Sequence, residues 1–378
     1  MVIDLDVVRP ASAIPAKPRR PARYRVVAVA AFVLALAGGA AAPDRAVGIT
    51  EVLTVDGQGS LTSLLTDEAY YTVRTDGHVE ALPLCTGCPR WSSRTKPGQR
   101  LTVAGEDTLI VDVNETAQVT FLDARTGALR WRLDDTLAVD VIGGRVAAWD
   151  VEKHILQMRD LPTGRVLWSR PAFNYSADEA YAVILDEAGG ATVVDAANGA
   201  ELTPRRDLGL PNPAARLVGD RLIVFGGSYL AAFSRDGLSR EWITATNSPY
   251  GVTPCGPGLL CAFGSAGLTV IDPADGSVRW TSPTWHGMGE SGVLFEESGR
   301  SAVVDLATGR VERELGRSGP VGGLLLVTEP GRTSVIGLAD GRVRGVLPLV
   351  LPSACVAAGP YLGCEKSDVT FTVWRLGR

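Results

Sequence analysis

The sequence is poor in the residues and motifs that most often mark an enzyme. It contains three histidines, His78, His154 and His286, which lie far apart along the chain. There is no serine nucleophile elbow, phosphate-binding loop or dinucleotide-binding fingerprint, and the lack of a Cys-x-x-Cys-His motif excludes covalent haem attachment. The net charge is −5 with both signs scattered, so no basic stripe suits nucleic acid. We therefore expect no catalytic, cofactor-binding or metal-binding residues and no nucleic-acid partner.

Composition otherwise places the chain among ordinary globular proteins, with 21% charged and 46% hydrophobic residues. Lysine is scarce, with 4 lysines against 33 arginines. We interpret this ratio as a coding bias, and isolated arginines therefore receive no functional weight. The length of 378 residues would allow two or three domains. The internal repeat described below argues instead for one large domain over residues 46–378.

The N-terminal part is organised around a run without charge, residues 26–42 (VVAVAAFVLALAGGAAA). Its 17 residues are the lower limit for a membrane-spanning helix. Residues 1–25 are proline-rich and end in a basic cluster, so we expect a disordered tail on the cytoplasmic side. The alternative is a cleaved signal peptide, because three alanines precede Pro43. We favour a single-pass anchor, since the segment before the uncharged run is long for the basic n-region of a signal peptide. Both interpretations place residues 46–378 outside the cytoplasm, as a membrane-bound or a secreted protein.

A degenerate repeat runs along the rest of the chain, and its clearest copy is FLDARTGALRW at residues 121–131. In the complete copies an apolar run ends in an aspartate, a turn glycine follows four residues later, and a tryptophan follows after four more, whereas other copies lack the aspartate or the tryptophan, and Trp242 follows its glycine after five. The glycines are Gly87, Gly127, Gly164, Gly199, Gly237, Gly276, Gly309 and Gly341. The aspartates are Asp123, Asp160, Asp195, Asp272 and Asp305, and the tryptophans are Trp91, Trp131, Trp168, Trp242 and Trp280.

Each part of the repeat has a structural interpretation. An aspartate side chain can accept hydrogen bonds from turn amides, and glycine adopts positive φ without steric cost. The flanking runs are short and rich in Val, Leu and Ile, which favours strands over helices. Tryptophan is large enough to require burial between neighbouring sheets. A unit of about four strands in roughly 40 residues predicts an all-β propeller built of four-stranded blades.

The blade number follows less directly from the sequence. The eight glycine turns and a last partial unit, ending in DVTFTVWRL, add up to nine. Division of the domain length by a typical blade gives about eight. We expect eight blades with one degenerate unit, and seven or nine remain open. The isolated segment ITEVLTV (49–55) can supply the strand that the last unit lacks, which would close the ring.

The copies LDARTGALRW, RDLPTGRVLW and IDPADGSVRW, with weaker copies VVDAANGAEL and VVDLATGRVEREL, resemble the PQQ-like (quinoprotein-type) β-propeller repeat family. The resemblance covers most of the chain and implies the fold. Members of this family include redox enzymes, but also non-catalytic scaffolds such as an envelope lipoprotein that assists outer-membrane protein assembly. A quinoprotein enzyme would need a calcium-held quinone, an aspartate base and, typically, two adjacent cysteines. The chain has no such cysteine pair, and the aspartates lie at the same turn position in every unit that keeps them, which indicates structure rather than catalysis.

The six cysteines form three pairs that are close in sequence: Cys85/Cys88, Cys255/Cys261 and Cys355/Cys364. An even count in an exported chain favours disulfides, and the second and third pairs each bracket a turn between strands. The motif Cys85-Thr86-Gly87-Cys88 has two further interpretations, a redox dithiol or half of a zinc site. We favour a structural bridge, because the motif lies at a turn between strands rather than at the start of a helix. A zinc site would also need two more ligands.

The sequence favours a binding protein over an enzyme. We expect a membrane-anchored, extracytoplasmic and monomeric propeller that binds a protein or cell-envelope component without catalysis and without a cofactor. The alternatives are a quinone-dependent dehydrogenase and a sensor of glycans or wall peptides. One isolated position stands out, His286 in the glycine-rich loop PTWHGMGESG, which could reach a face of the propeller. A histidine in such a loop is still more often a solvated residue than a ligand.

Overall fold

The chain folds into short strands throughout the part that the structure describes. The structure is a computed structural model, and it describes residues 48–113, 118–134, 138–210, 214–246, 248–289 and 292–377. These ranges contain no α-helix, in agreement with the all-β expectation. They accordingly include no helix that is long and apolar enough to cross a membrane. The predicted tail (1–25) and anchor (26–42) lie outside the described residues.

The strands form antiparallel four-stranded sheets, which we name blades 1 to 9 in chain order. Blade 1 contains β2 (Ser60–Leu65), β3 (Ala69–Arg74), β4 (His78–Pro83) and β5 (Trp91–Arg94), and blade 2 contains β6 (Arg100–Ala104), β7 (Thr108–Val113), β8 (Gln118–Asp123) and β9 (Leu129–Leu133). Blade 3 contains β10 (Ala138–Ile142), β11 (Arg145–Asp150), β12 (Ile155–Asp160) and β13 (Val166–Pro171), and blade 4 contains β14 (Asn174–Ala177), β15 (Tyr181–Leu185), β16 (Gly190–Asp195) and β17 (Glu201–Asp207).

The second half of the chain continues the same order. Blade 5 contains β18 (Ala214–Val218), β19 (Arg221–Gly226), β20 (Tyr229–Ser234) and β21 (Arg240–Ala245), and blade 6 contains β22 (Pro249–Gly256), β23 (Leu259–Gly264), β24 (Gly267–Ile271) and β25 (Val278–Ser282). Blade 7 contains β26 (Gly287–Met288), β27 (Val293–Phe295), β28 (Ser301–Asp305) and β29 (Arg310–Gly316), and blade 8 contains β30 (Gly319–Val321), β31 (Leu324–Glu329), β32 (Arg332–Gly337) and β33 (Val343–Pro348). Blade 9 contains β34 (Val350–Ala358), β35 (Tyr361–Lys366), β36 (Thr370–Arg375) and β1 (Thr50–Asp56).

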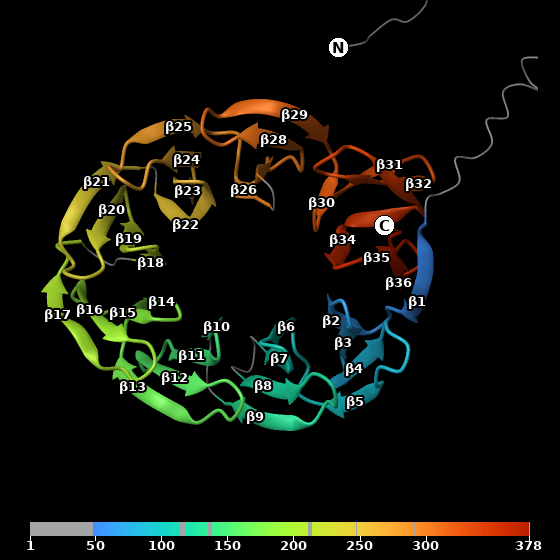
Figure 1. The fold of residues 1–378 in the computed structure, drawn as a ribbon, viewed down its shortest axis with the longest axis horizontal. Helices are drawn as coiled ribbons and strands as arrows, with labels where there is room; N and C mark the ends of the chain where they lie inside the picture. The colour runs from blue at the N-terminus through green and yellow to red at the C-terminus, as the bar shows by residue number, and fades with distance from the viewer. Residues whose placement is uncertain are drawn as a thin grey trace, which may run out of the picture. The chain divides into compact units, whose positions relative to one another are not determined.

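The blades are arranged around a ring, which is the β-propeller architecture (Figure 1). In the view of Figure 1, first strands such as β6, β10 and β14 lie on the inner side of the ring, and fourth strands such as β9, β13 and β17 lie on the perimeter. The described residues therefore form a propeller of four-stranded blades, as the repeat predicts.

The expectation of eight blades is wrong, because the described residues form nine four-stranded sheets. No unit is degenerate. Blades 7 and 8 complete their sheets in few residues, since β26 has 2 residues and β30 has 3. Dividing the domain length by a typical blade length underestimates the number of blades when inner strands are this short. The direct count of glycine turns plus the last partial unit was the better guide.

The first strand of the described chain belongs to the last blade. β1 pairs antiparallel with β36, from Thr50 opposite Arg375 to Asp56 opposite Thr370, and it is the outermost strand of blade 9. Figure 1 shows this strand, in blue, beside the red strands of the C-terminal end. The two ends of the described chain thus share one sheet.

Nine clusters of buried apolar residues occupy the junctions between neighbouring blades of the described residues. Most of them contain eight or more buried residues, and the cluster between blades 9 and 1 contains Tyr70, Tyr361 and Phe371. The cluster between blades 7 and 8 is the smallest, with three buried members, Val293, Leu325 and Leu338. Burial of apolar surface between sheets is the main stabilising contribution in such a ring, so this junction is the weakest.

Candidate functional site

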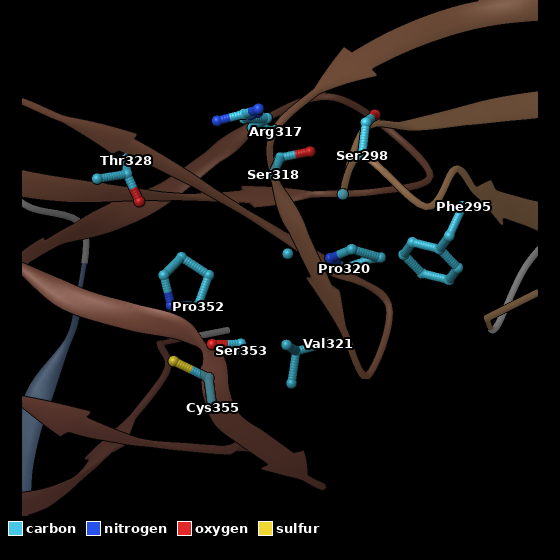
Figure 2. Close-up of a pocket in the computed structure, with 12 residues that line it drawn as sticks. Phe295, Ser298, Arg317, Ser318, Pro320, Val321, Thr328, Pro352, Ser353 and Cys355 are labelled. Atoms are coloured by element: carbon cyan, nitrogen blue, oxygen red, sulfur yellow. The ribbon is translucent and has the colours of Figure 1, made fainter. Parts of the chain in front are cut away.

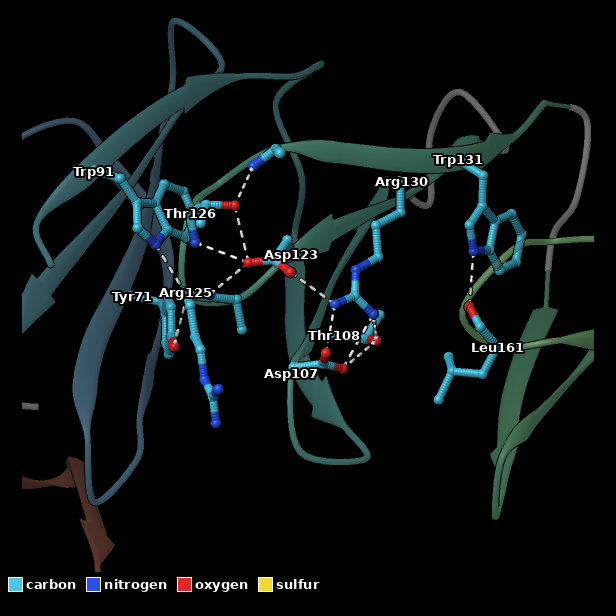
Figure 3. A network of polar contacts seen from close by, with 12 residues as sticks. Tyr71, Trp91, Asp107, Thr108, Asp123, Arg125, Thr126, Arg130, Trp131 and Leu161 are labelled. Carbon is cyan, nitrogen blue, oxygen red and sulfur yellow. Dashed lines mark hydrogen bonds and ion pairs between the residues drawn. The ribbon is translucent and has the colours of Figure 1, made fainter. Parts of the chain in front are cut away.

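The repeat tryptophans make the joints between blades. The indole Nε1 of Trp91 in blade 1 donates a hydrogen bond of 2.9 Å to the carbonyl of Ala124 in blade 2 (Figure 3). The same contact recurs from Trp131 to Leu161, Trp168 to Ala196, Trp242 to Pro273 and Trp280 to Leu306, at 2.8 to 3.0 Å. In each case the acceptor lies three residues before the turn glycine of the next blade. The tryptophans thus link neighbouring blades by a polar bond in addition to packing.

Glycine is required at the turn of each of these joints for two separate reasons, its backbone conformation and the close approach of the indole ring. Gly127 has φ of +70°, which glycine adopts without strain. A Cβ atom at this position would lie 2.3 Å from Cε3 of Trp91, because the indole ring rests directly against the turn. Gly164, Gly199, Gly276 and Gly309 combine positive φ with the same close approach of a tryptophan. The regular spacing of glycine and tryptophan in the sequence therefore reflects contacts between the tryptophan of one blade and the turn glycine of the next.

The repeat aspartates fasten the same turns. The carboxylate of Asp123 accepts hydrogen bonds from the amides of Arg125 and Thr126, at 3.1 and 2.9 Å, and from the Thr126 hydroxyl (Figure 3). Asp160, Asp195, Asp272 and Asp305 each accept at least one amide bond from their own turn. These carboxylates are engaged within perimeter turns and do not converge on a common site.

One arginine, Arg130, stabilises the clearest of these turns. Where β8 pairs with β9, the register shifts at Phe121/Leu122, so that Arg130 is the extra residue of a β-bulge. Its Nη2 lies 2.7 Å from Oδ2 of Asp123 and 2.6 Å from Oδ2 of Asp107. The hydrogen bond from Arg130 lowers the pKa of the Asp123 carboxyl to about 2. Arg279 pairs with Asp272 in the same way in blade 6.

Several junctions replace the tryptophan by another donor. Between blades 4 and 5, the hydroxyl of Thr203 donates to the carbonyl of Asp236. Here Gly237 lacks positive φ, and Leu238 adopts φ of +51° instead. Between blades 7 and 8, Arg313 donates to the carbonyl of Leu338 at 2.6 Å. The sequence pattern did not reveal these substitutions, because it retains only the turn glycine.

All six cysteines are paired locally, which confirms the predicted disulfides. The bridges are Cys85–Cys88, Cys255–Cys261 and Cys355–Cys364, with Cα–Cα distances of 5.5, 5.6 and 4.1 Å. Cys255, Cys261, Cys355 and Cys364 are buried, whereas Cys85 is exposed. No tryptophan covers Gly87 in the Cys85–Cys88 turn, and a Cβ atom there would meet nothing within 4 Å.

The three histidines are distributed over blades 1, 3 and 7. His286 Nδ1 lies 3.6 Å from Glu297 Oε1, and the backbone carbonyl of His286 accepts a bond from the Tyr250 hydroxyl. Among the described residues, no group of three or more His, Cys, Asp or Glu side chains is placed to hold a metal ion.

A cleft of about 580 Å³ lies between blades 7, 8 and 9 (Figure 2). Its apolar wall comes from Phe295 at the end of β27, Pro320 in β30 and Pro352 in β34. Its polar lining residues are Ser298, Arg317, Ser318, Thr328 and Ser353. The cleft borders the blade 7–8 junction and is lined by the short inner strand β30.

The charge at this cleft comes from Arg317, which is exposed and has no ion-pair or hydrogen-bond partner within the ranges that the structure describes. Other arginines near turns, such as Arg130 and Arg205, are paired with carboxylates. His286 lies beside the cleft, since its amide donates to the carbonyl of Phe295 at 2.8 Å. An open cleft with an unpaired guanidinium, hydroxyls and proline rings suits binding rather than acid–base chemistry. Sequence reasoning missed it, because its residues belong to no repeat motif.

Comparisons with known proteins agree with this architecture. The profile of the family described as "Outer membrane protein assembly factor BamB" matches residues 75–282, more than half of the chain. Among solved structures, BamB from Moraxella catarrhalis is 14% identical, over 86% of this chain and 97% of that one, with a TM-score of 0.47. Apo AztD from Citrobacter koseri is 13% identical over 75% and 94%, and the computationally designed Ika8 protein is 10% identical over 86% and 99%, both with a TM-score of 0.50. A search of curated proteins finds no match.

Fold and repeat together define a PQQ-like β-propeller, which confirms the resemblance drawn from the repeat copies. The chain belongs to the family described as outer membrane protein assembly factor BamB. The likenesses to Ika8 and AztD are below 25% identity and support the fold alone.

Proposed function

We propose that this protein is a non-catalytic binding scaffold of the cell envelope, whose partner is a protein. The observation that carries the proposal is the use of the conspicuous residues. The repeat aspartates hold turns, the repeat tryptophans join blades, and the cysteines are bridged. The residues that would attract attention in an enzyme therefore serve the ring itself. The family match supports a protein-interaction scaffold in general.

The cleft between blades 7, 8 and 9 is the proposed binding site. A partner segment would place an acidic group beside Arg317 and apolar side chains against Phe295 and Pro352. Charge-assisted contacts of this kind fix the register of a bound segment, and the apolar wall contributes most of the affinity. Because the cleft is open at the surface of the ring, a segment can bind there without a conformational change of the blades.

Site-specific photocrosslinking tests this proposal. A photoreactive side chain is placed at Ser353 in the cleft and, as a matched control, at Thr281, which is exposed on the perimeter strand β25. We expect one discrete protein adduct from envelope-bearing cells at Ser353 and none at Thr281, and we expect Arg317→Glu to abolish it. Equal labelling at both positions would overturn the proposed site.

The enzymatic alternative is tested on the same protein. We expect the purified chain to show no saturable binding of pyrroloquinoline quinone with calcium and no dye reduction with alcohols or sugars. Saturable quinone binding with turnover would establish the dehydrogenase instead. Displacement of the crosslink by glycan or wall-peptide fragments, without any protein adduct, would favour the sensor.

We also propose that residues 26–42 anchor the protein as a monomer in the cell membrane, with the N-terminus in the cytoplasm. The basic residues before the uncharged run support this orientation. A C-terminal tag should then be accessible from outside on intact cells or spheroplasts. A tag that becomes accessible only after the membrane is breached would contradict it, and a soluble product that begins near Pro43 would establish signal cleavage.

A further inference from the structure

The turn between β4 and β5 differs from the turns of the other blades in how it is held. In blade 2, the corresponding turn is fastened by Asp123, which accepts two amide bonds and a hydroxyl bond. In blade 1, the residue four positions before the turn glycine is Pro83, which offers no carboxylate. The turn instead contains the Cys85–Cys88 disulfide, with a long backbone bond of 3.4 Å from the Cys88 amide to the Cys85 carbonyl. The disulfide takes the place of the aspartate.

This disulfide is also open to attack. Cys85 is exposed and Cys88 is half-buried, whereas the four cysteines of the other two bridges are at most 8% exposed. In five other blades a tryptophan ring covers the turn glycine, but nothing lies within 4 Å of a Cβ atom at Gly87. An incoming thiolate must approach along the axis of the sulfur–sulfur bond, and exposed bridges are therefore the labile ones.

The same turn carries the joint between the last blade and the first. Leu84, directly before Cys85, presents its carbonyl to the Tyr361 hydroxyl of blade 9 at 3.2 Å. Tyr361 belongs to the apolar cluster of this junction, and Leu84 packs against that cluster. We call the junction between blades 9 and 1 the seam. Loosening of the Cys85–Cys88 turn displaces the Leu84 carbonyl and therefore weakens the hydrogen bond from Tyr361 across the seam.

We propose that Cys85–Cys88 is a site of thiol–disulfide exchange with an external dithiol, and that its reduction loosens the seam between blades 9 and 1. A reductant thiolate attacks Sγ of Cys85, forms a mixed disulfide and releases Cys88 as a thiolate. The second thiol of the reductant then attacks the reductant's sulfur atom in the mixed disulfide and releases Cys85 as a thiolate. The reductant leaves as a disulfide, and both cysteines end as protonated thiols. Two electrons and two protons are transferred, so the step balances.

Graded reduction of the native, full-length protein tests whether Cys85–Cys88 is the site of thiol–disulfide exchange. Dithiothreitol is added, thiols are alkylated at intervals, and peptides are mapped. We expect Cys85 and Cys88 to be modified at least about tenfold faster than the other four cysteines, because those lie inside the packed clusters. Modification of all six cysteines at one common rate would overturn the proposal, as would modification of Cys85 and Cys88 only after unfolding.

Amide hydrogen exchange of residues 82–90 tests whether loss of the disulfide loosens the seam between blades 9 and 1. We expect exchange there to be at least about fivefold faster in the Cys85→Ser/Cys88→Ser variant and in Tyr361→Phe than in the oxidised protein. Tyr71→Phe is the matched control, because the Tyr71 hydroxyl donates to Ala124 at 3.2 Å in a turn that Asp123 fastens. It should leave residues 82–90 unchanged. Equal exchange of residues 82–90 in the oxidised protein and in the double serine variant would overturn the link to the seam.

Discussion

The hydroxyl of Tyr361 donates a hydrogen bond to the carbonyl of Leu84, although the two residues are 277 positions apart in the chain. Leu84 lies three residues before Gly87, as Ala124 lies three residues before Gly127. The seam therefore uses the same acceptor position as the tryptophan joints, with a phenol in place of an indole. Arg313 serves the junction of blades 7 and 8 with a guanidinium. These joints share the acceptor position and differ in the donor, whereas the Thr203 bond between blades 4 and 5 uses another acceptor, Asp236, one residue before Gly237.

Replacement of a joint tryptophan should cost more than replacement of a tryptophan without the bond. We expect Trp168→Phe to lower the free energy of unfolding by about 2 kcal/mol, because it removes a hydrogen bond of 3.0 Å together with buried area. Trp374→Phe is the control, since Trp374 is equally buried and makes no such joint, and about 1 kcal/mol is expected. Urea unfolding measures both. Equal losses would show that the indole bond contributes nothing.

The contact between glycine and tryptophan can be separated from the strain of positive φ. We expect Gly127→Ala to destabilise the protein by about 3 kcal/mol, because the new methyl group would displace Trp91 and the backbone would be strained. Gly219→Ala has the strain alone, since φ is +61° and nothing lies within 4 Å, and should cost about 1 kcal/mol. Thermal and urea unfolding test the difference. A loss for Gly127→Ala no larger than for Gly219→Ala would contradict it.

The Asp123 turn should make stability depend on acid. The pKa of the Asp123 carboxyl is lowered to about 2 in the folded protein, chiefly by Arg130. Its stabilising effect is therefore fully present above the unfolded pKa of about 4 and is lost as the pH falls through the folded value. We expect Asp123→Asn to be less stable than wild type at pH 6, with the gap closing between about pH 4 and pH 2. A gap of constant size across this range would exclude the ion pair as its source.

The junction of blades 7 and 8 should open before the others. Its cluster has three buried residues, whereas the junction of blades 2 and 3 has nine. Hydrogen exchange should therefore be fastest in β30 and β31 among the inner strands of the ring. Removal of the Arg313 bond in Arg313→Met should raise exchange around Leu338 further, while leaving the blade 2–3 junction unchanged. Uniform exchange around the ring would rule out a local weak point.

The repeat alone was sufficient to predict the propeller, because each copy contains both members of a contact that recurs around the ring. Asp123, Gly127 and Trp131 follow one another at intervals of four residues, and the joint pairs each tryptophan with the glycine of the next copy. Such a pattern is visible without coordinates. The blade number was less accessible, because β26 and β30 are too short to give a periodic signal.

The candidate cleft could not be predicted from the sequence for a different reason. Phe295, Arg317 and Pro352 come from three blades and have no fixed spacing. They come together because three inner segments end near one another, which depends on the lengths of strands and turns. The donors that replace tryptophan, Thr203 and Arg313, were equally hidden, because their role depends on position rather than residue type.

The pairing of β1 with β36 has a consequence for the order of folding. Thr50 and Arg375 are opposite one another, yet almost the whole propeller is synthesised between them. Each of blades 1 to 8 can form from residues that follow one another closely, whereas blade 9 requires its outer strand to wait for the end of the chain. Until then, β1 has an unpaired backbone and is open to pairing with other chains. Ribosome-bound or translocating intermediates should therefore be the species most prone to aggregation or to chaperone capture, and premature termination would leave β1 permanently without its partner.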